Sequence, residues 1–240
     1  MSVKYETNWD YYYNKTHRKL LSLLGLTGNL FLNREIGKYI VQNANNLGSF
    51  IEIGAGSGYL SKLMSEKFRE CFILDRSKFA LEISSKRAKK AHSILCDVFE
   101  FNKKEEFDVV VSLGLVEHFN EKEMQNLISI HIEIAKKDGC VFILVPAHYK
   151  KREEVVGLPS MIRKFGFQDA FAEYKIEDYL KKNNIQHIKK YLDFIPHYTW
   201  YYEILRKIVL FPYLLFGWNL EFIVHKEKGS HVVFFINKKK

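Results

Sequence analysis

Two groups of residues in this 240-residue chain have the types and spacing to do chemistry. The first is FIEIGAGSGYLS at residues 50–61, where three glycines fall within five positions after an apolar run. Because glycine inside a regular element costs about 0.5–1 kcal/mol relative to alanine, such a cluster needs a reason. It is either a flexible strand-to-helix turn, or a place where backbone closely approaches a ligand at a helix N-terminus.

The second group is Glu117 and His118, in the segment GLVEHF. An imidazole titrates near neutral pH, so a positioned histidine can take a proton from a reacting group, as can a glutamate. The structural alternative is that this pair caps the next helix or packs beneath a ligand. His148, two residues after Pro146, is a second candidate for proton transfer, and its alternative is a simple loop position.

Apolar runs of strand length alternate along the chain with segments of helical pattern. Strands are expected at residues 49–53, 71–75, 93–96, 107–113, 139–145, 187–195 and 230–236. Helices are expected near 58–68, 78–90, 121–136, 176–183 and 199–217. This order indicates a parallel sheet covered by helices on both faces, and runs such as VFILV lack the polar alternation of a half-exposed strand.

Two regions fall outside this alternation. Residues 1–46 carry a dense aromatic cluster followed by a helical pattern, and they are expected to cap a domain formed by residues 47–240. Residues of about 147–175 follow the fifth strand. Because segments after the carboxyl ends of strands lie over the ligand crevice of an open α/β sheet, both regions are candidate lids.

The glycine spacing separates two kinds of nucleotide ligand. A dinucleotide-binding turn has the pattern G-x-G-x-x-G, whereas this chain has G-A-G-S-G with Glu52 two residues before the first glycine. Asp75, which closes the second strand, suits either ligand, because a carboxylate can accept both ribose hydroxyls of any adenosine. The spacing and Glu52 therefore favour a ligand other than NAD.

Four segments occur in order between about residues 48 and 146, namely IEIGAGSGYLS, FILDRS, ILCDVFEF and FDVVVSLGLVEHF. Together they resemble the successive motifs of the class I S-adenosylmethionine-dependent methyltransferases. GLVEHF is similar to the subset that methylates small molecules on oxygen, nitrogen or carbon. The expected fold is α/β and Rossmann-like, with a seven-stranded, mostly parallel sheet, helices on both faces and an antiparallel last strand.

The resemblance also implies which residues bind the cofactor. In chain order they are Glu52, Gly54, Ala55, Gly56, Gly58, Asp75, Arg76, Asp97, Val98, Leu113 and Gly114. The glycine-rich turn would pass close to the methionine part, and Glu52 would bind its ammonium group. Asp75 would bind the ribose hydroxyls, and the end of the fourth strand would lie beside the sulfonium.

Three of these residues would surround the adenine. Arg76 would lie beside the ring, Asp97 would accept a hydrogen bond from the exocyclic amine, and the Val98 backbone N–H would bond the ring. Taken singly, Asp75 and Asp97 are also ordinary turn or cap residues, and Arg76 is also an ordinary solvated side chain. The placement of the two aspartates after adjacent strands favours ligand roles.

Methyl transfer from a sulfonium is an in-line displacement, so the enzyme mainly aligns the acceptor with the methyl group and excludes water. An acceptor hydroxyl or ammonium must also lose a proton, for which Glu117, His118 and His148 are the candidate catalytic residues. The expected function is methylation of a small molecule on oxygen or nitrogen, with S-adenosylhomocysteine as the cofactor product. No metal site is expected.

Two other functions stay open. The net charge of +9 permits contact with nucleic acid, although lysine-rich, solvated helix faces give the same excess. An RNA or DNA acceptor is disfavoured because no N/D-P-P-Y/F tetrad follows the fourth strand. A cofactor-binding protein without catalysis is the third reading, and the cofactor motifs show no damage that would favour it.

The composition, with 47% hydrophobic and 27% charged residues, is that of a globular protein and not of a disordered one. The N-terminus lacks the features of a secretory signal, so a cytoplasmic protein is expected. Three widely separated cysteines are expected to be buried, reduced thiols. The oligomeric state is left open.

Two segments near the C-terminal end bear on the acceptor. Residues 208–218, IVLFPYLLFGW, are too few to span a membrane, which takes about 20 residues. They would form a core helix, rest on an anionic membrane surface or line the entrance for a lipid-like acceptor. The aromatic residues of 197–202 would line an acceptor pocket or belong to the core.

Overall fold

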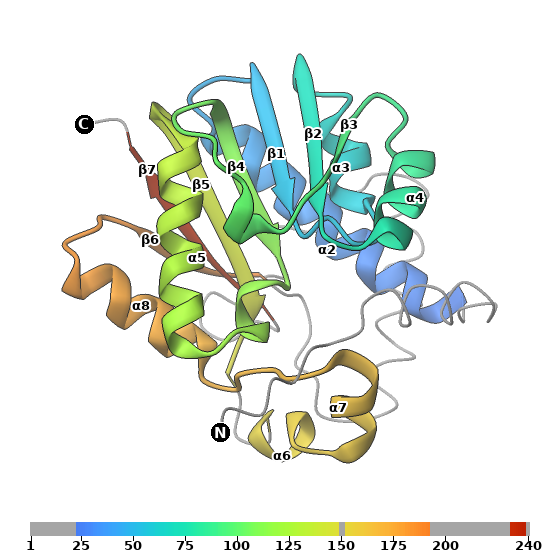
Figure 1. Ribbon diagram of the computed structural model, residues 1–240, viewed down its shortest axis with the longest axis vertical. Coiled ribbons are helices and arrows are strands. Elements are labelled where there is room, and N and C mark those ends of the chain that lie inside the picture. Colours follow the sequence, from blue (N-terminus) through green and yellow to red (C-terminus); the bar gives the residue numbers. More distant parts are fainter. Residues whose placement is uncertain (1–22, 149–151, 193–230, 239–240) are drawn as a thin grey trace, which may run out of the picture.

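The computed structural model describes residues 23–148, 152–192 and 231–238 (Figure 1). Side chains are described from residue 32 onward. The N-terminal aromatic cluster, the aromatic segment 197–202 and the helix predicted near 199–217 lie outside the described residues. No helix within the described part of the chain has both the length and the apolar character needed to cross a membrane.

Within the described residues, seven strands form one sheet in the order β3-β2-β1-β4-β5-β7-β6. The strands are β1 (Ser49–Ile53), β2 (Glu70–Asp75), β3 (His92–Leu95), β4 (Phe107–Leu113), β5 (Ala135–Pro146), β6 (Ile188–Leu192) and β7 (His231–Asn237). Pairing is parallel from β3 to β5, and β7 runs antiparallel to both β5 and β6. The predicted sheet, with its antiparallel last strand, is confirmed.

Helices cover both faces of this sheet. They are α2 (Leu23–Asn43), α3 (Tyr59–Met64), α4 (Lys78–Arg87), α5 (Glu121–Ile134), α6 (Arg152–Val156), α7 (Pro159–Phe165) and α8 (Ala172–Lys182). Figure 1 shows α5 on the near side of the sheet and α2 on the far side. Two short 3-10 turns, η1 (Val98–Glu100) and η2 (Val116–His118), follow β3 and β4.

Strand β4 explains why the sheet is covered on both faces. Its Val110 packs with buried residues of α5 and α8, whereas Val109 and Val111 pack with those of α2 and α3. Successive side chains of a strand point to opposite faces, so an unbroken apolar run needs apolar partners on both. The apolar run of residues 107–113 therefore belongs at the centre of the molecule.

Several boundaries differ from those predicted. The helix expected to reach residue 136 ends at Ile134, because Ala135 already pairs with Phe107 and begins β5. The helix expected over 58–68 ends at Met64, because Arg69 and Glu70 turn back to bond the carbonyls that precede β1. Helix α8 begins four residues before the expected position 176. These differences come from pairing and packing partners that are distant in sequence.

The order of the strands brings together the turn that follows β1 and the turn that follows β4, at the carboxyl ends of these two strands. The chain continues from β1 through β2 and β3 on one side, and from β4 on the other, so β1 and β4 meet where the strand order reverses. A Cβ built on Gly54, after β1, would lie 2.9 Å from Cδ1 of Leu115, after β4. Ligands of open α/β sheets bind at such a switch point. Helices α6 and α7, from the expected lid region 147–175, lie beyond the carboxyl end of β5 (Figure 1).

The cysteines are mostly inside, as predicted. Cys71 and Cys140 are buried, Cys96 is partly exposed, and all three are free thiols. Burial raises the pKa of the Cys71 thiol to about 12. This thiol therefore stays protonated at neutral pH and packs as an apolar side chain in the core.

Candidate functional site

The turn after β1 requires its glycines for backbone reasons. Gly54, Gly56 and Gly58 have φ angles of +68°, +49° and +68°, which only glycine adopts without steric cost. The Gly54 N–H donates to the Leu74 carbonyl of β2 at 2.8 Å. A Cβ on Gly58 would lie 2.5 Å from the Cβ and 2.7 Å from the Cα of Ser84 on α4. Close packing against α4 thus accounts for Gly58, and its contact with a cofactor stays a prediction.

Glu52 lies buried behind this turn, on β1. Its Oε2 accepts hydrogen bonds from the Ser61 backbone N–H at 3.0 Å and from the Ser61 hydroxyl. Burial, with a smaller contribution from the charge of Asp75, raises the pKa of Glu52 to about 7, although these two hydrogen bonds act to lower it. The group therefore titrates near neutral pH, and a cation bound beside it would favour its ionised form.

Asp75 connects the glycine-rich turn to the start of α4. Its Oδ2 accepts from the Gly56 N–H at 3.0 Å, and its Oδ1 accepts from the Ser77 N–H at 2.9 Å. Each carboxylate oxygen has two lone pairs, so the Asp75 side chain can accept further hydrogen bonds while these two persist. The role of Asp75 toward ribose stays a prediction, and its role in holding the turn is an addition.

The residues predicted around adenine lie together at the ends of β2 and β3. Arg76 Nη1 and Asp97 Oδ2 are 3.8 Å apart. Asp97 Oδ1 accepts from the Phe99 N–H at 3.0 Å and so caps η1. Val98 opens this turn, whose first N–H has no partner within the turn itself. The exposed ring of Phe99 meets the Phe119 ring edge to face, with 5.4 Å between centroids.

Glu117 lies in the 3-10 turn η2, directly after the carboxyl end of β4. A Cβ built on Gly114 would lie 3.6 Å from its Oε1. Glu117 is 2% exposed, and its Oε2 has no hydrogen-bond partner in the part of the chain that the structure describes. Burial raises the pKa of Glu117, although the charges of His118 and Arg152 oppose this. The neutral carboxyl is therefore favoured more strongly than in a solvated glutamate.

His118 is oriented by the segment that precedes α8. Its Nδ1 lies 2.7 Å from the Phe167 carbonyl oxygen, and its Nε2 lies 4.0 Å from Glu117 Oε1, beyond hydrogen-bond distance. A carbonyl oxygen can only accept, so Nδ1 carries the proton of this bond. In the neutral ring the lone pair is then on Nε2, the nitrogen that faces Glu117.

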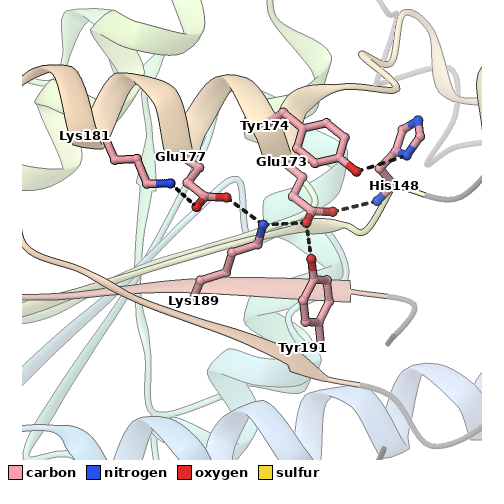
Figure 2. A network of polar contacts seen from close by, with 7 residues as sticks. All are labelled: His148, Glu173, Tyr174, Glu177, Lys181, Lys189 and Tyr191. Carbon is pink, nitrogen blue, oxygen red and sulfur yellow. Dashed lines mark hydrogen bonds and ion pairs between the residues drawn. The ribbon is translucent and has the colours of Figure 1, made fainter. Parts of the chain in front are cut away.

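His148 has different partners. Its backbone N–H donates to Glu173 Oε2 at 2.8 Å, and its ring stacks on Phe171 with 5.1 Å between centroids. Its Nδ1 lies 3.4 Å from the Tyr174 hydroxyl (Figure 2). Its Nε2 lies 3.7 Å from a carboxylate oxygen of Glu153. The structure thus places the Glu117 carboxyl beside the His118 ring, whereas His148 contacts residues of α6 and α8. A catalytic role of His148 stays a prediction.

The sequence did not reveal the residues that hydrogen-bond to the predicted site and keep it in place. Arg87 Nη1 donates to the Ser57 carbonyl of the glycine-rich turn, and its guanidinium lies 3.7 Å above the Tyr59 ring. The Asp169 N–H donates to the Glu117 carbonyl at 2.7 Å. A basic run at residues 86–90 hid Arg87 among solvated lysines. Asp169 stands just before a helix, a usual place for a turn residue, which was the signal available for it.

Comparison with known proteins agrees with this geometry. Residues 50–139 match the model of a family described as a methyltransferase domain. No curated protein matches the chain.

Solved structures share the fold. An S-adenosylmethionine-dependent methyltransferase from Clostridium acetobutylicum superposes with a TM-score of 0.60 at 13% identity, over 85% of this chain and 89% of that one. The N-methyltransferase NodS from Bradyrhizobium japonicum, in complex with S-adenosylhomocysteine, gives 0.56 at 13% identity, over 87% and 88%. A candidate O-methyltransferase from Nostoc punctiforme gives 0.58 at 13% identity over 95% of this chain, which spans only 60% of that protein.

Proposed function

We propose that this chain is a class I S-adenosylmethionine-dependent methyltransferase and that it methylates a small-molecule acceptor on oxygen or nitrogen. The acceptor would bind between the end of β4 and the segment that precedes α8. Glu117 and His118 stand there, beside the strand end that the family resemblance assigns to the sulfonium.

The described residues suit this cofactor. When bound, S-adenosylmethionine supplies a methyl group that is already activated for transfer. Glu52, buried and titrating near neutral pH, is suited to the ammonium group, and the glycine-rich turn leaves backbone free of side chains. Asp75, Arg76 and Asp97 gather polar groups where the ribose and adenine would lie.

The observation that carries the proposal is the 2.7 Å hydrogen bond between His118 Nδ1 and the Phe167 carbonyl. It leaves Nε2 as the nitrogen that can accept a proton from an acceptor hydroxyl or ammonium. Glu117 Oε2, buried and without a partner among the described residues, is free to hydrogen-bond the same acceptor. The pair would therefore orient the acceptor and remove its proton.

A transfer assay tests the proposal. Methyl-labelled S-adenosylmethionine is incubated with a panel of phenols, catechols, amines and carboxylic acids, and separately with RNA. His118→Gln should lower kcat on the acceptor by about 10²-fold or more, the usual contribution of a general base, with unchanged cofactor affinity. His92→Gln, on the exposed edge strand β3, is the matched control and should keep parent activity.

Two results would contradict the proposal. Full activity of His118→Gln would exclude it as the base. Labelling of RNA alone, with binding that weakens steeply as salt rises, would replace the small molecule by a nucleic-acid acceptor.

A further inference from the structure

Two hydrogen bonds join residues 167–169 to the Glu117–His118 pair. The Asp169 N–H donates to the Glu117 carbonyl, and His118 Nδ1 donates to the Phe167 carbonyl, both at 2.7 Å. The second bond decides which ring nitrogen carries the proton, because the other tautomer would set a lone pair against the carbonyl oxygen. Whatever fixes residue 167 in place therefore also fixes the tautomer of His118.

The Asp169 side chain anchors this segment. It is 7% exposed, and both of its carboxylate oxygens are engaged. Oδ1 accepts from the Phe171 N–H at 2.8 Å, and Oδ2 accepts from Lys175 Nζ at 2.6 Å. The ammonium of Lys175 is also 3.9 Å from Glu121 Oε2, at the start of α5. The carboxylate thus ties the segment to α8 and, through Lys175, to α5.

Helix α8 is a firm support for this anchor. Its Ala172, Ile176 and Leu180 are buried in the same cluster as the core-facing residues of α5. At its first turn, Glu173 accepts from the His148 N–H, from Lys189 Nζ and from the Tyr191 hydroxyl (Figure 2). The N-terminal end of α8 is therefore held against the carboxyl end of β5 and against the side chains of β6.

The backbone before Phe167 is also specialised. Gly166 has φ +70° and ψ −158°, a region that is essentially open to glycine alone. Its N–H closes α7 by donating to the Ile162 carbonyl at 2.8 Å. A residue with a Cβ would not keep these backbone angles at position 166. The direction in which the chain leaves α7, and with it the position of the Phe167 carbonyl, therefore depends on glycine.

We propose that Asp169 is a positioning residue for His118, which holds the Phe167 carbonyl in place and so keeps the imidazole proton on Nδ1 and the lone pair on Nε2. The proposal deepens the proposed function and rests on it where His118 serves as the base. A ring protonated on Nε2 instead could not take the proton of the acceptor. Asp169 touches neither cofactor nor acceptor in this account and acts through His118.

The tautomer is measured by NMR on the full chain with ¹⁵N-labelled histidine, at about pH 8, where imidazoles are largely neutral. The His118 signals are identified by their loss in His118→Gln. The parent should show a protonated Nδ1 and an unprotonated Nε2. Asp169→Ala should shift the proton toward Nε2 and lower kcat by between about 10- and 100-fold, with little change in the KM for S-adenosylmethionine.

Further variants separate positioning from general damage. Asp169→Asn keeps an acceptor for the Phe171 N–H and loses the ion pair with Lys175, so its tautomer and kcat should lie between those of the parent and Asp169→Ala. Gly166→Ala should shift the tautomer through the backbone, without touching the Asp169 carboxylate. Asp178→Ala, on the exposed side of α8, removes a solvent-exposed ion pair with Lys182 and should leave both readouts at parent values.

Two results would overturn the proposal. One is a parent His118 that carries its proton on Nε2, and the other is Asp169→Ala with parent tautomer but reduced kcat. The spectrum requires no acceptor, so a failure to find methyl transfer would reject the proposed function and still leave the tautomer decided.

Discussion

Glu52 is a buried carboxyl group whose pKa of about 7 makes the stability of the fold depend on pH. Between the ordinary pKa of 4.5 and about 7, the unfolded chain ionises at this residue while the folded chain keeps the proton. Stability therefore falls with rising pH across this window, by about 3 kcal/mol for a shift of this size, and changes no further above it. A bound cation that stabilises the ionised form would offset that cost.

This predicts that cofactor binding near pH 7 releases a proton. The ammonium group of S-adenosylmethionine beside Glu52 should lower the pKa of the carboxyl, so a share of the molecules loses its proton on binding. Calorimetric titrations in buffers of different ionisation enthalpy measure the number released. Glu52→Gln should bind more weakly and release none at this site. Equal proton release from parent and variant would show that Glu52 does not face the cofactor.

The glycines show what a sequence can reveal at the residue scale. The sequence identified the positions that need glycine, but the reason for Gly58 is the contact with Ser84, which lies 26 positions further along the chain. The partners of Glu52 and His118, Ser61 and Phe167, were hidden for the same reason. A residue's type predicts the chemistry that it can do, whereas its hydrogen-bond partners depend on the folded chain.

Among the elements, α4 acts on the glycine-rich turn from outside. Ser84 leaves no room for a side chain at Gly58, and Arg87 bonds the Ser57 carbonyl and covers the Tyr59 ring. A charged donor to a carbonyl contributes about 1.5–3 kcal/mol, and a cation over an aromatic ring adds about 0.5–1 kcal/mol. The helix therefore limits the conformations of the turn before any ligand binds.

Arg87→Ala should weaken binding of S-adenosylmethionine by about ten-fold or more, since 1.4 kcal/mol corresponds to that factor. Without Arg87, part of the free energy of cofactor binding would be used to order the glycine-rich turn. Lys86→Ala removes the same charge from the neighbouring, exposed position and should leave the Kd unchanged. A lower Tm with an unchanged Kd for Arg87→Ala would mean that the contact serves stability alone.

The contact between α8 and β6 depends on a buried ion pair. Glu173 is 1% exposed and lies 2.8 Å from Lys189 Nζ, which also pairs with Glu177 at 2.7 Å (Figure 2). Burial alone would raise the pKa of Glu173, but the bonds from Lys189, Tyr191 and the His148 N–H outweigh it and lower the pKa. Its stabilising contribution is therefore complete above the ordinary glutamate pKa and is lost as pH falls through the lowered value.

Glu173→Leu should cost about 3–5 kcal/mol in urea unfolding at pH 7, because Lys189 loses its most buried partner. The loss should shrink at lower pH as the parent carboxyl becomes protonated. Asp178→Leu, which breaks an exposed pair on the same helix, should change stability little at any pH. A loss for Glu173→Leu that does not vary with pH would indicate packing alone and not the ion pair.

At the scale of the whole molecule, the sheet could be predicted because its strands are apolar runs buried on both faces. β1 and β4 begin and end at the predicted residues, since their sequences alone require burial. The early start of β5 could not be predicted, because AKKD has no apolar run and its strand character comes from pairing with Phe107. Covering regions are harder still, since the residues of α6 and α7 carry no motif.

Some of the exposed lysines in the described part of the chain are paired with glutamates. Lys103, Lys104 and Lys137 each lie within 4.0 Å of a glutamate, and their side chains are largely exposed. Such pairs neutralise each other and contribute little to stability. These three lysines are typical of a solvated surface, and none of them is an unpaired cation that a phosphate backbone would need.

We propose that S-adenosylmethionine binds at the turn after β1, against Glu52 and Asp75. Calorimetric titration of the purified chain with S-adenosylmethionine, S-adenosylhomocysteine and NAD in parallel tests it most directly. We predict saturable binding of the two sulfur nucleosides and no binding of NAD. Asp75→Ala should lose this binding and keep the circular dichroism of the folded parent. Binding of NAD alone, or parent affinity for S-adenosylmethionine in Asp75→Ala, would contradict the account.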